Sequence, residues 1–155
     1  MTGRTGKVAS INSSGGGVPK RPVLFSNVNT LGLEADRHVS KDHGGPDRAI
    51  CIYSLDLIKA LRAEGHPIDV GTAGENLTVE GLDWALMRPG AILTVGAEVR
   101  LEITSFTPPC KTIKASFLEG NFVRISEKVH PGWSRVYARI LTPGEVKAYC
   151  SIVIE

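Results

Sequence analysis

The sequence predicts a β-rich fold, mainly β with a few helices, that closes or nearly closes into a barrel. The 17 glycines and 9 prolines are spread along the chain and divide it into short segments, which is typical of sheets with frequent turns. About seven of these segments have the alternating or continuous apolar patterns of strands, and a single one has a convincing helical pattern. This ratio favours a barrel with helical additions over a helical bundle.

The first half of the chain holds the clearest strand and the helix. Residues 49–53 (AICIY) form a nearly continuous apolar run, as expected of a strand buried on both faces. Ser54 follows as an N-cap, and apolar residues recur at helical spacing over residues 55–64 until Gly65 ends the helix. Before them we expect strands at 7–12 and 23–28, a break at 13–17 (SSGGG) and an irregular charged stretch at 31–43.

In the second half, glycine and proline separate further strand patterns. Residues 91–95 and 98–103 flank a Gly-Ala pair and predict a hairpin. The remaining expected elements are a strand at 76–79, a short helix at 112–117, a strand at 135–141, a turn at 142–144 and a last strand at 145–154.

Length and composition limit the class of protein. A chain of 155 residues suits a single domain over residues 1–155. The net charge of +2 gives no basic field of the kind that nucleic-acid binding needs, and no apolar run is long enough for a membrane span. The N-terminal stretch lacks the apolar segment of a signal peptide, so we expect a cytoplasmic protein. Cys51, Cys110 and Cys150 are far apart without a CxxC motif, which argues against a disulfide framework and a cysteine zinc site.

Cys110, in "TSFTPPCKT", has the most unusual setting of the three cysteines. Pro109 stiffens the backbone directly before it. If the residues that follow are helical, Cys110 lies at a helix N-terminus, where free amides together with Lys111 and Lys114 favour an anion. A thiolate there suits a nucleophile, a persulfide carrier or a soft-metal ligand. The alternative is a buried structural cysteine, an interpretation that fits Cys51 well.

Three other stretches combine polar groups with glycines. In "KDHGGPDRAI", His43 and Asp47 can share a hydrogen bond that orients the imidazole toward a ligand, or Asp47 can cap a turn. In "SSGGGVPKRPV", glycine amides and Lys20 can hold an anion, or the stretch is a plain surface loop. In "GTAGENLTVEGL", Glu75 and Asn76 can face a ligand at the mouth of a strand, or belong to a turn.

Taken in order, "GGGVPKRPV", "GLEADRH", "HGGPDRAI", "GENLTVEGL" and "PPC" resemble the MOSC domain, a family named for the C-terminal domain of molybdenum cofactor sulfurases. The resemblance covers nearly the whole chain and implies a MOSC-type β-barrel with a cleft for the molybdenum cofactor, a phosphate-bearing pyranopterin with dithiolene sulfurs. A late cysteine of the family, which matches Cys110, ligates molybdenum or carries sulfur. Some relatives reduce N-hydroxylated compounds, and members are also described as binding pyridoxal phosphate.

From this resemblance we expect Cys110 to be the catalytic residue and the molybdenum ligand. The expected cofactor-binding residues are Lys20 and Arg37 at the phosphate, His43, Asp47 and Asn76 at the pterin edge, and Glu75 and Lys111 in the same cleft.

The resemblance implies a molybdenum-dependent reductase of N-hydroxylated substrates that takes electrons from an external donor protein. The alternative is a non-catalytic carrier of persulfide sulfur or of the cofactor, served by a sulfur-donor protein, with pyridoxal phosphate as a further ligand. The chain departs from the family where Ala35 replaces a frequent glycine before Asp36, and where residues 147–150 lack a Gly-Asp pair. These departures put close equivalence with the characterised reductases in doubt.

Overall fold

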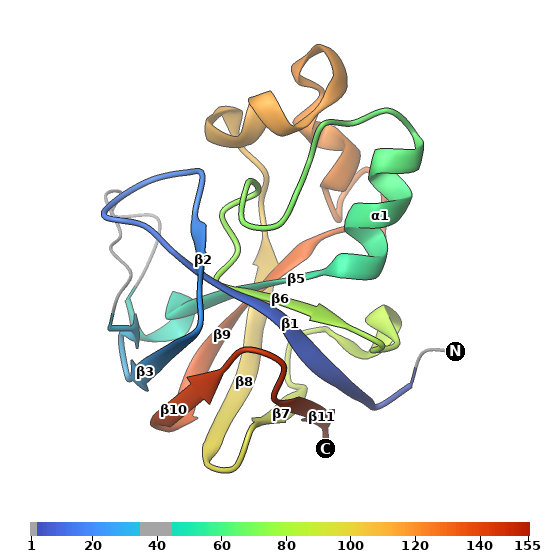
Figure 1. Ribbon diagram of the computed structural model, residues 1–155. Helices are drawn as coiled ribbons and strands as arrows, with labels where there is room; N and C mark the ends of the chain where they lie inside the picture. The colour runs from blue at the N-terminus through green and yellow to red at the C-terminus, as the bar shows by residue number, and fades with distance from the viewer. Residues whose placement is uncertain (1–2, 35–44) are drawn as a thin grey trace.

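The computed structural model describes residues 3–34 and 45–155 and contains a closed β-barrel (Figure 1). Seven strands form the ring in the order β11–β7–β8–β9–β5–β6–β1, and pairing of β1 with β11 closes it. The predicted β-rich barrel is therefore confirmed. The ring strands are β1 (Thr5–Ser13), β5 (Ile50–Ser54), β6 (Leu77–Glu80), β7 (Ile92–Val95), β8 (Val99–Thr107), β9 (Arg135–Thr142) and β11 (Ser151–Ile154).

A smaller sheet lies beside the barrel, in the order β10–β3–β4, and β2 extends the main sheet by pairing with β1. Figure 1 shows β3 and β10 at one side of the barrel, opposite the end of the chain marked N. The bounds are β2 (Arg21–Val23), β3 (Phe25–Asn29), β4 (Gly32–Leu33) and β10 (Gly144–Lys147).

Two expected strands are wrong in extent because the chain changes sheet inside them. The strand expected at 23–28 is two strands: β2 pairs with β1, β3 pairs with β10, and Leu24 between them is 79% exposed. The strand expected at 145–154 also divides, at a turn where Tyr149 has a φ of 69°, and β11 returns to the barrel between β1 and β7. Apolar residues lie on both sides of each break, so the pattern could not reveal them.

The other strand predictions hold, with one extension and one change. β8 continues beyond the expected hairpin as far as Thr107, so the first part of "TSFTPPCKT" belongs to the sheet. The turn expected at 142–144 is a bend between two sheets, with Pro143 alone between β9 and β10.

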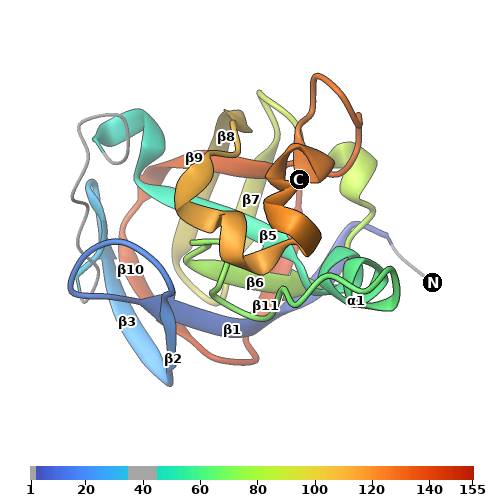
Figure 2. The same ribbon diagram turned by 90° about the horizontal axis from the view of Figure 1, so that it is seen from above.

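α1 (Leu55–Ala63) and the segment at 111–125 lie at one end of the barrel. Ser54 caps α1 by accepting a hydrogen bond from the backbone N–H of Leu57 at 3.1 Å, as predicted. Figure 2 shows a segment of three short 3-10 helices lying across this end of the barrel beside α1: η3 (Lys111–Ser116), η4 (Leu118–Gly120) and η5 (Phe122–Ile125). η3 is the expected short helix, and two further 3-10 helices, η1 (Pro46–Arg48) and η2 (Trp84–Leu86), lie outside this segment. Among the described residues, no helix is long and apolar enough to cross a membrane.

Strand β5 separates two hydrophobic cores. Ile50 and Ile52 belong to the core inside the barrel, while Tyr53, on the other face, belongs to a second core beneath the helices. The alternation of side chains across a strand sets this division, and β5 is accordingly buried along its whole length. The second core comprises Tyr53, Ile58, Leu61, Ile68, Ala73, Ile113, Phe117 and Ile125.

Candidate functional site

Cys110 lies where β8 leaves the barrel and the helical segment begins. Two prolines follow the last residue of β8, and Cys110 then precedes η3 with an extended backbone (φ −142°, ψ 173°). Its thiol is half-buried, and its Sγ lies 2.8 Å from the Oγ1 of Thr112. The loop therefore holds a partly accessible thiol close to a hydroxyl group.

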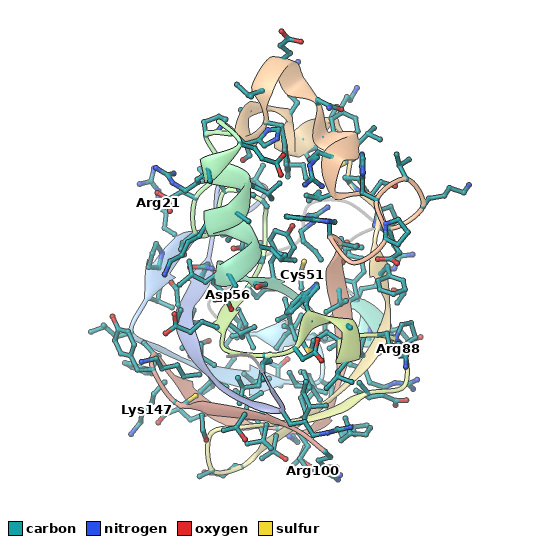
Figure 3. All side chains as sticks on the ribbon, turned by 90° about the vertical axis from the view of Figure 1, so that its right-hand side faces the viewer. Arg21, Cys51, Asp56, Arg88, Arg100 and Lys147 are labelled. Atoms are coloured by element: carbon teal, nitrogen blue, oxygen red, sulfur yellow. The ribbon has the colours of Figure 1, made fainter. Side chains whose placement is uncertain are left out.

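The other two cysteines have different surroundings. Cys51 is 6% exposed on β5, where burial raises the pKa of its thiol, and its Sγ lies 3.8 Å from the Oγ1 of Thr107. Figure 3 shows Cys51 in the interior of the molecule. Cys150 is half-buried in the turn between β10 and β11, and burial raises its thiol pKa too. The structural interpretation of Cys51 is thus consistent with its burial.

Two buried cations lie near Cys51. Arg135, the first residue of β9, is 4% exposed, and Lys20 is 8% exposed. Both lower the pKa of the Cys51 thiol through their charges, against the larger effect of burial. Buried cations are costly unless anionic or polar groups compensate them, and Arg135 is compensated by two backbone carbonyls and by the nearby carboxyl of Glu75.

Tyr137 connects Cys51 and Cys110 electrostatically. The pKa of its hydroxyl is raised to about 12, mainly by burial and to a smaller extent by both thiols, while Arg135 and Arg48 act to lower it. The guanidinium of Arg48 lies 5.4 Å from the centre of the Tyr137 ring. Tyr137 is directly opposite Cys51 in the pairing of β9 with β5. Tyr137 therefore lies between the strand that carries Cys51 and the side chain of Arg48.

Glu75 and Asn76 lie in the buried polar layer behind this site. The Oε2 of Glu75 accepts hydrogen bonds from the Gly71 N–H at 3.2 Å and the Thr78 hydroxyl at 2.9 Å. Its Oε1 is buried without a hydrogen-bond partner among the described residues. Burial, only partly offset by these hydrogen bonds and by Arg135, raises its pKa to about 6. Asn76 accepts a hydrogen bond from the Cys51 N–H at 2.9 Å, which ties this layer to β5.

The remaining expected residues differ in how far the structure describes them. Lys111 is exposed directly after Cys110, and Asp47 is exposed on η1, with its Oδ1 3.8 Å from the Nη1 of Arg139. Arg37 and His43 lie outside the described residues. In the glycine loop, the Gly16 N–H donates to the Oγ of Ser14 at 3.2 Å, so this amide already has a partner within the loop.

Sequence reasoning missed two members of the site, Arg135 and Tyr137. The available signal was the alternation of "RVYARIL", which puts both on the face of β9 opposite Val136, a residue of the barrel core. The alternation by itself does not show that the helical segment covers this face of β9. Among the described residues, no group of three or more His, Cys, Asp or Glu side chains could hold a metal ion.

Comparison with known proteins agrees with the barrel fold. The family model of the MOSC domain matches residues 39–153. Among curated proteins, a "Reductase" of Gibberella moniliformis (strain M3125 / FGSC 7600) is 35% identical over 100 residues, covering 62% of this chain and 17% of the relative. Protein YiiM of Escherichia coli (strain K12) is 29% identical over 127 residues, covering 78% of this chain. The chain thus spans less than a fifth of the reductase and 55% of YiiM.

Solved structures show the same fold. YiiM from Geobacillus stearothermophilus superposes with a TM-score of 0.74 at 22% identity, covering 97% of this chain and 75% of that one. The YUAD protein from Bacillus subtilis gives a TM-score of 0.75 at 15% identity and covers 97% and 95% of the two chains.

Proposed function

The chain belongs to the MOSC domain family, and from this premise we propose that it binds the molybdenum cofactor through Cys110 and reduces N-hydroxylated compounds. The observation that carries the proposal is the half-buried thiol of Cys110 on a proline-stiffened loop that the buried Arg135 contacts at the carbonyl of Pro108. A thiolate is a suitable ligand for a transition metal. The similarity to a protein called "Reductase" supports the redox part of the proposal.

The described side chains fit such a ligand in charge and in hydrogen bonding. Lys20 and Arg135 match the anionic phosphate and dithiolene groups that the family resemblance implies. The Nε of Arg135 and the Oε1 of Glu75 are buried and without partners among the described residues. One is a donor and the other an acceptor, so together they suit a ligand that carries both kinds of group.

When bound, the cofactor supplies two-electron redox chemistry at its metal. The chain would hold the metal through Cys110, and the stiff Pro108–Pro109 backbone would limit the movement of that thiol. Tyr137 keeps its proton at neutral pH because its pKa is about 12, so its Oη would act as a hydrogen-bond donor within the site. Electrons would come from an external donor protein.

A second candidate is a carrier of sulfur, favoured by the 2.8 Å approach of the Thr112 hydroxyl to the Cys110 Sγ. A hydroxyl donor at this distance would stabilise an anionic sulfur. In this role the Cys110 thiolate attacks the outer sulfur of a donor persulfide, the donor S–S bond breaks, and the donor leaves as a thiolate. Cofactor transfer without turnover would use the same residues.

The test is molybdenum content and reductase activity of protein made in a host that synthesises the cofactor. We expect near-stoichiometric molybdenum and reduction of an amidoxime by reduced viologen in the wild type, and loss of both in Cys110→Ser. Cys150→Ser is the matched control, because Cys150 is also half-buried but lies in the turn between β10 and β11. A wild type without molybdenum or reductase activity after gentle purification contradicts the proposal.

The same preparations separate the other candidates. A sulfur carrier would show one added sulfur on Cys110 by mass spectrometry after incubation with a cysteine desulfurase, without reducing the amidoxime. Pyridoxal phosphate binding would show the absorbance of an aldimine, with Lys20, the buried lysine of the described chain, as its candidate amine.

A further inference from the structure

Arg135 is buried to an unusual degree for an arginine. It lies on the face of β9 that carries Tyr137, and only 4% of it is exposed. Burying a guanidinium removes much of its hydration and is tolerated where the group is hydrogen-bonded. The contacts of Arg135 therefore indicate what the protein uses it for.

The guanidinium joins two loops of the site. Its Nη1 donates to the backbone carbonyl of Ala73 at 2.6 Å, and its Nη2 donates to that of Pro108 at 3.3 Å. Ala73 belongs to the loop that leads to Glu75, while Pro108 lies two residues before Cys110. The planar fork of an arginine can donate to two carbonyls at once, whereas a lysine ammonium has no such fixed geometry.

The loop that carries Cys110 needs this contact because its own backbone cannot continue the sheet. The pairing of β8 with β9 ends with Thr107 opposite Arg135. The next two residues are prolines, which have no N–H to donate to a neighbouring strand. The side chain of Arg135 reaches the carbonyl of Pro108 just beyond the last backbone pair.

We propose that Arg135 is a positioning residue that holds the Cys110 loop (residues 108–113) against the loop at 71–76. The purpose of this positioning, to present Cys110 to a cofactor, rests on the function proposed above. The tether itself does not depend on that function and can be measured in protein without cofactor.

The primary test is amide hydrogen exchange in Arg135→Lys made without cofactor. This variant retains the positive charge and loses the forked geometry. Two reporter amides are protected by hydrogen bonds inside the tethered loops: Ile113 N–H to Cys110 O at 3.2 Å, and Gly74 N–H to Gly71 O at 3.1 Å. We expect both to exchange about tenfold faster, as loss of one hydrogen bond to a charged donor implies, with amides of β5 and β8 unchanged.

Arg100→Met is the matched control, since it removes an arginine from β8 whose ion pair with Glu155 is exposed. Figure 3 places Arg100 at the end of the barrel away from the helical segment. A second variant, Arg135→Ala, tests the guanidinium itself. Added guanidinium at concentrations far below those that unfold the protein should restore protection of Ile113, whereas the same concentration of sodium chloride should not.

Two outcomes overturn the inference. Unchanged exchange of both reporters in Arg135→Lys would show that the contacts do not tether the loops. An equal increase in β5 and β8 would show that Arg135 stabilises the whole fold instead of positioning one loop. Molybdenum content is then compared between Arg135→Lys and wild type. A wild type that binds no molybdenum rejects the proposed function, while the exchange result still decides the role of Arg135.

Discussion

Replacing Glu75 by glutamine should change how the stability of the protein depends on pH. The carboxyl of Glu75 is fully buried, and burial raises its pKa from 4.5 to about 6. Below pH 4.5 the group is protonated in both the folded and the unfolded chain. Between 4.5 and about 6 the unfolded chain releases the proton first, so stability falls as pH rises. Above about 6 the group is ionised in both states and the full cost of the buried charge remains.

The size of the effect follows from the two pKa values. The difference between 4.5 and about 6 corresponds to about 2 kcal/mol of unfolding free energy. Glutamine cannot ionise, although its side-chain oxygen can still accept the hydrogen bonds that the Gly71 N–H and Thr78 hydroxyl donate to Glu75. The stability of Glu75→Gln relative to wild type should therefore increase by about 2 kcal/mol between roughly pH 3.5 and pH 7, with most of the change between 4.5 and about 6.

The assay is urea unfolding of both proteins at a series of pH values, followed by circular dichroism. The difference between the two curves removes the contribution of groups that titrate alike in both proteins. Glu119→Gln, at an exposed position, controls for the change of chemistry. A difference curve for Glu75→Gln that stays flat across this range, or that slopes the other way, would refute the reasoning that burial dominates at Glu75.

Three further predictions concern the frame of the site. Gly71→Ala should destabilise the protein by about 3 kcal/mol or more in urea unfolding. Gly71 has a φ of 79°, and a Cβ there would overlap the carbonyl oxygen of Lys20. The control Gly90→Ala, also at positive φ but with open space around it, should lower stability much less. Tyr53→Phe should cost about 1 kcal/mol by the same measurement, because it removes a 2.7 Å hydrogen bond to a backbone carbonyl, and an unchanged stability would show that this bond contributes nothing. Cys51→Ser should lower stability by about 1 kcal/mol or more, because it buries a more polar group. The molybdenum content of this variant should equal that of the wild type. Loss of the metal would contradict a purely structural role for Cys51.

Local patterns were sufficient for the strands and the helix whose neighbours in sequence are also their neighbours in the fold. The run at 49–53 predicted a strand buried on both faces, and the Ser54 cap predicted the start of α1, because burial and capping leave signatures in adjacent residues. The strands at 23–28 and 145–154 were not resolved correctly. Their breaks arise where the chain passes from one sheet to another, and alternation carries no information about which strand is the partner.

The candidate site shows the same division. The sequence by itself identified Cys110 as the cysteine with a distinctive setting, because prolines and lysines next to it in the chain make that setting. It also indicated the MOSC family, through stretches that occur in order along the chain. Tertiary structure alone decided that Arg135 is buried, that Tyr137 lies opposite Cys51, and that the carboxyl of Glu75 lies inside a polar layer. These properties depend on the helical segment covering the outer face of β9 and β5, and no pattern within a single strand records what packs against it.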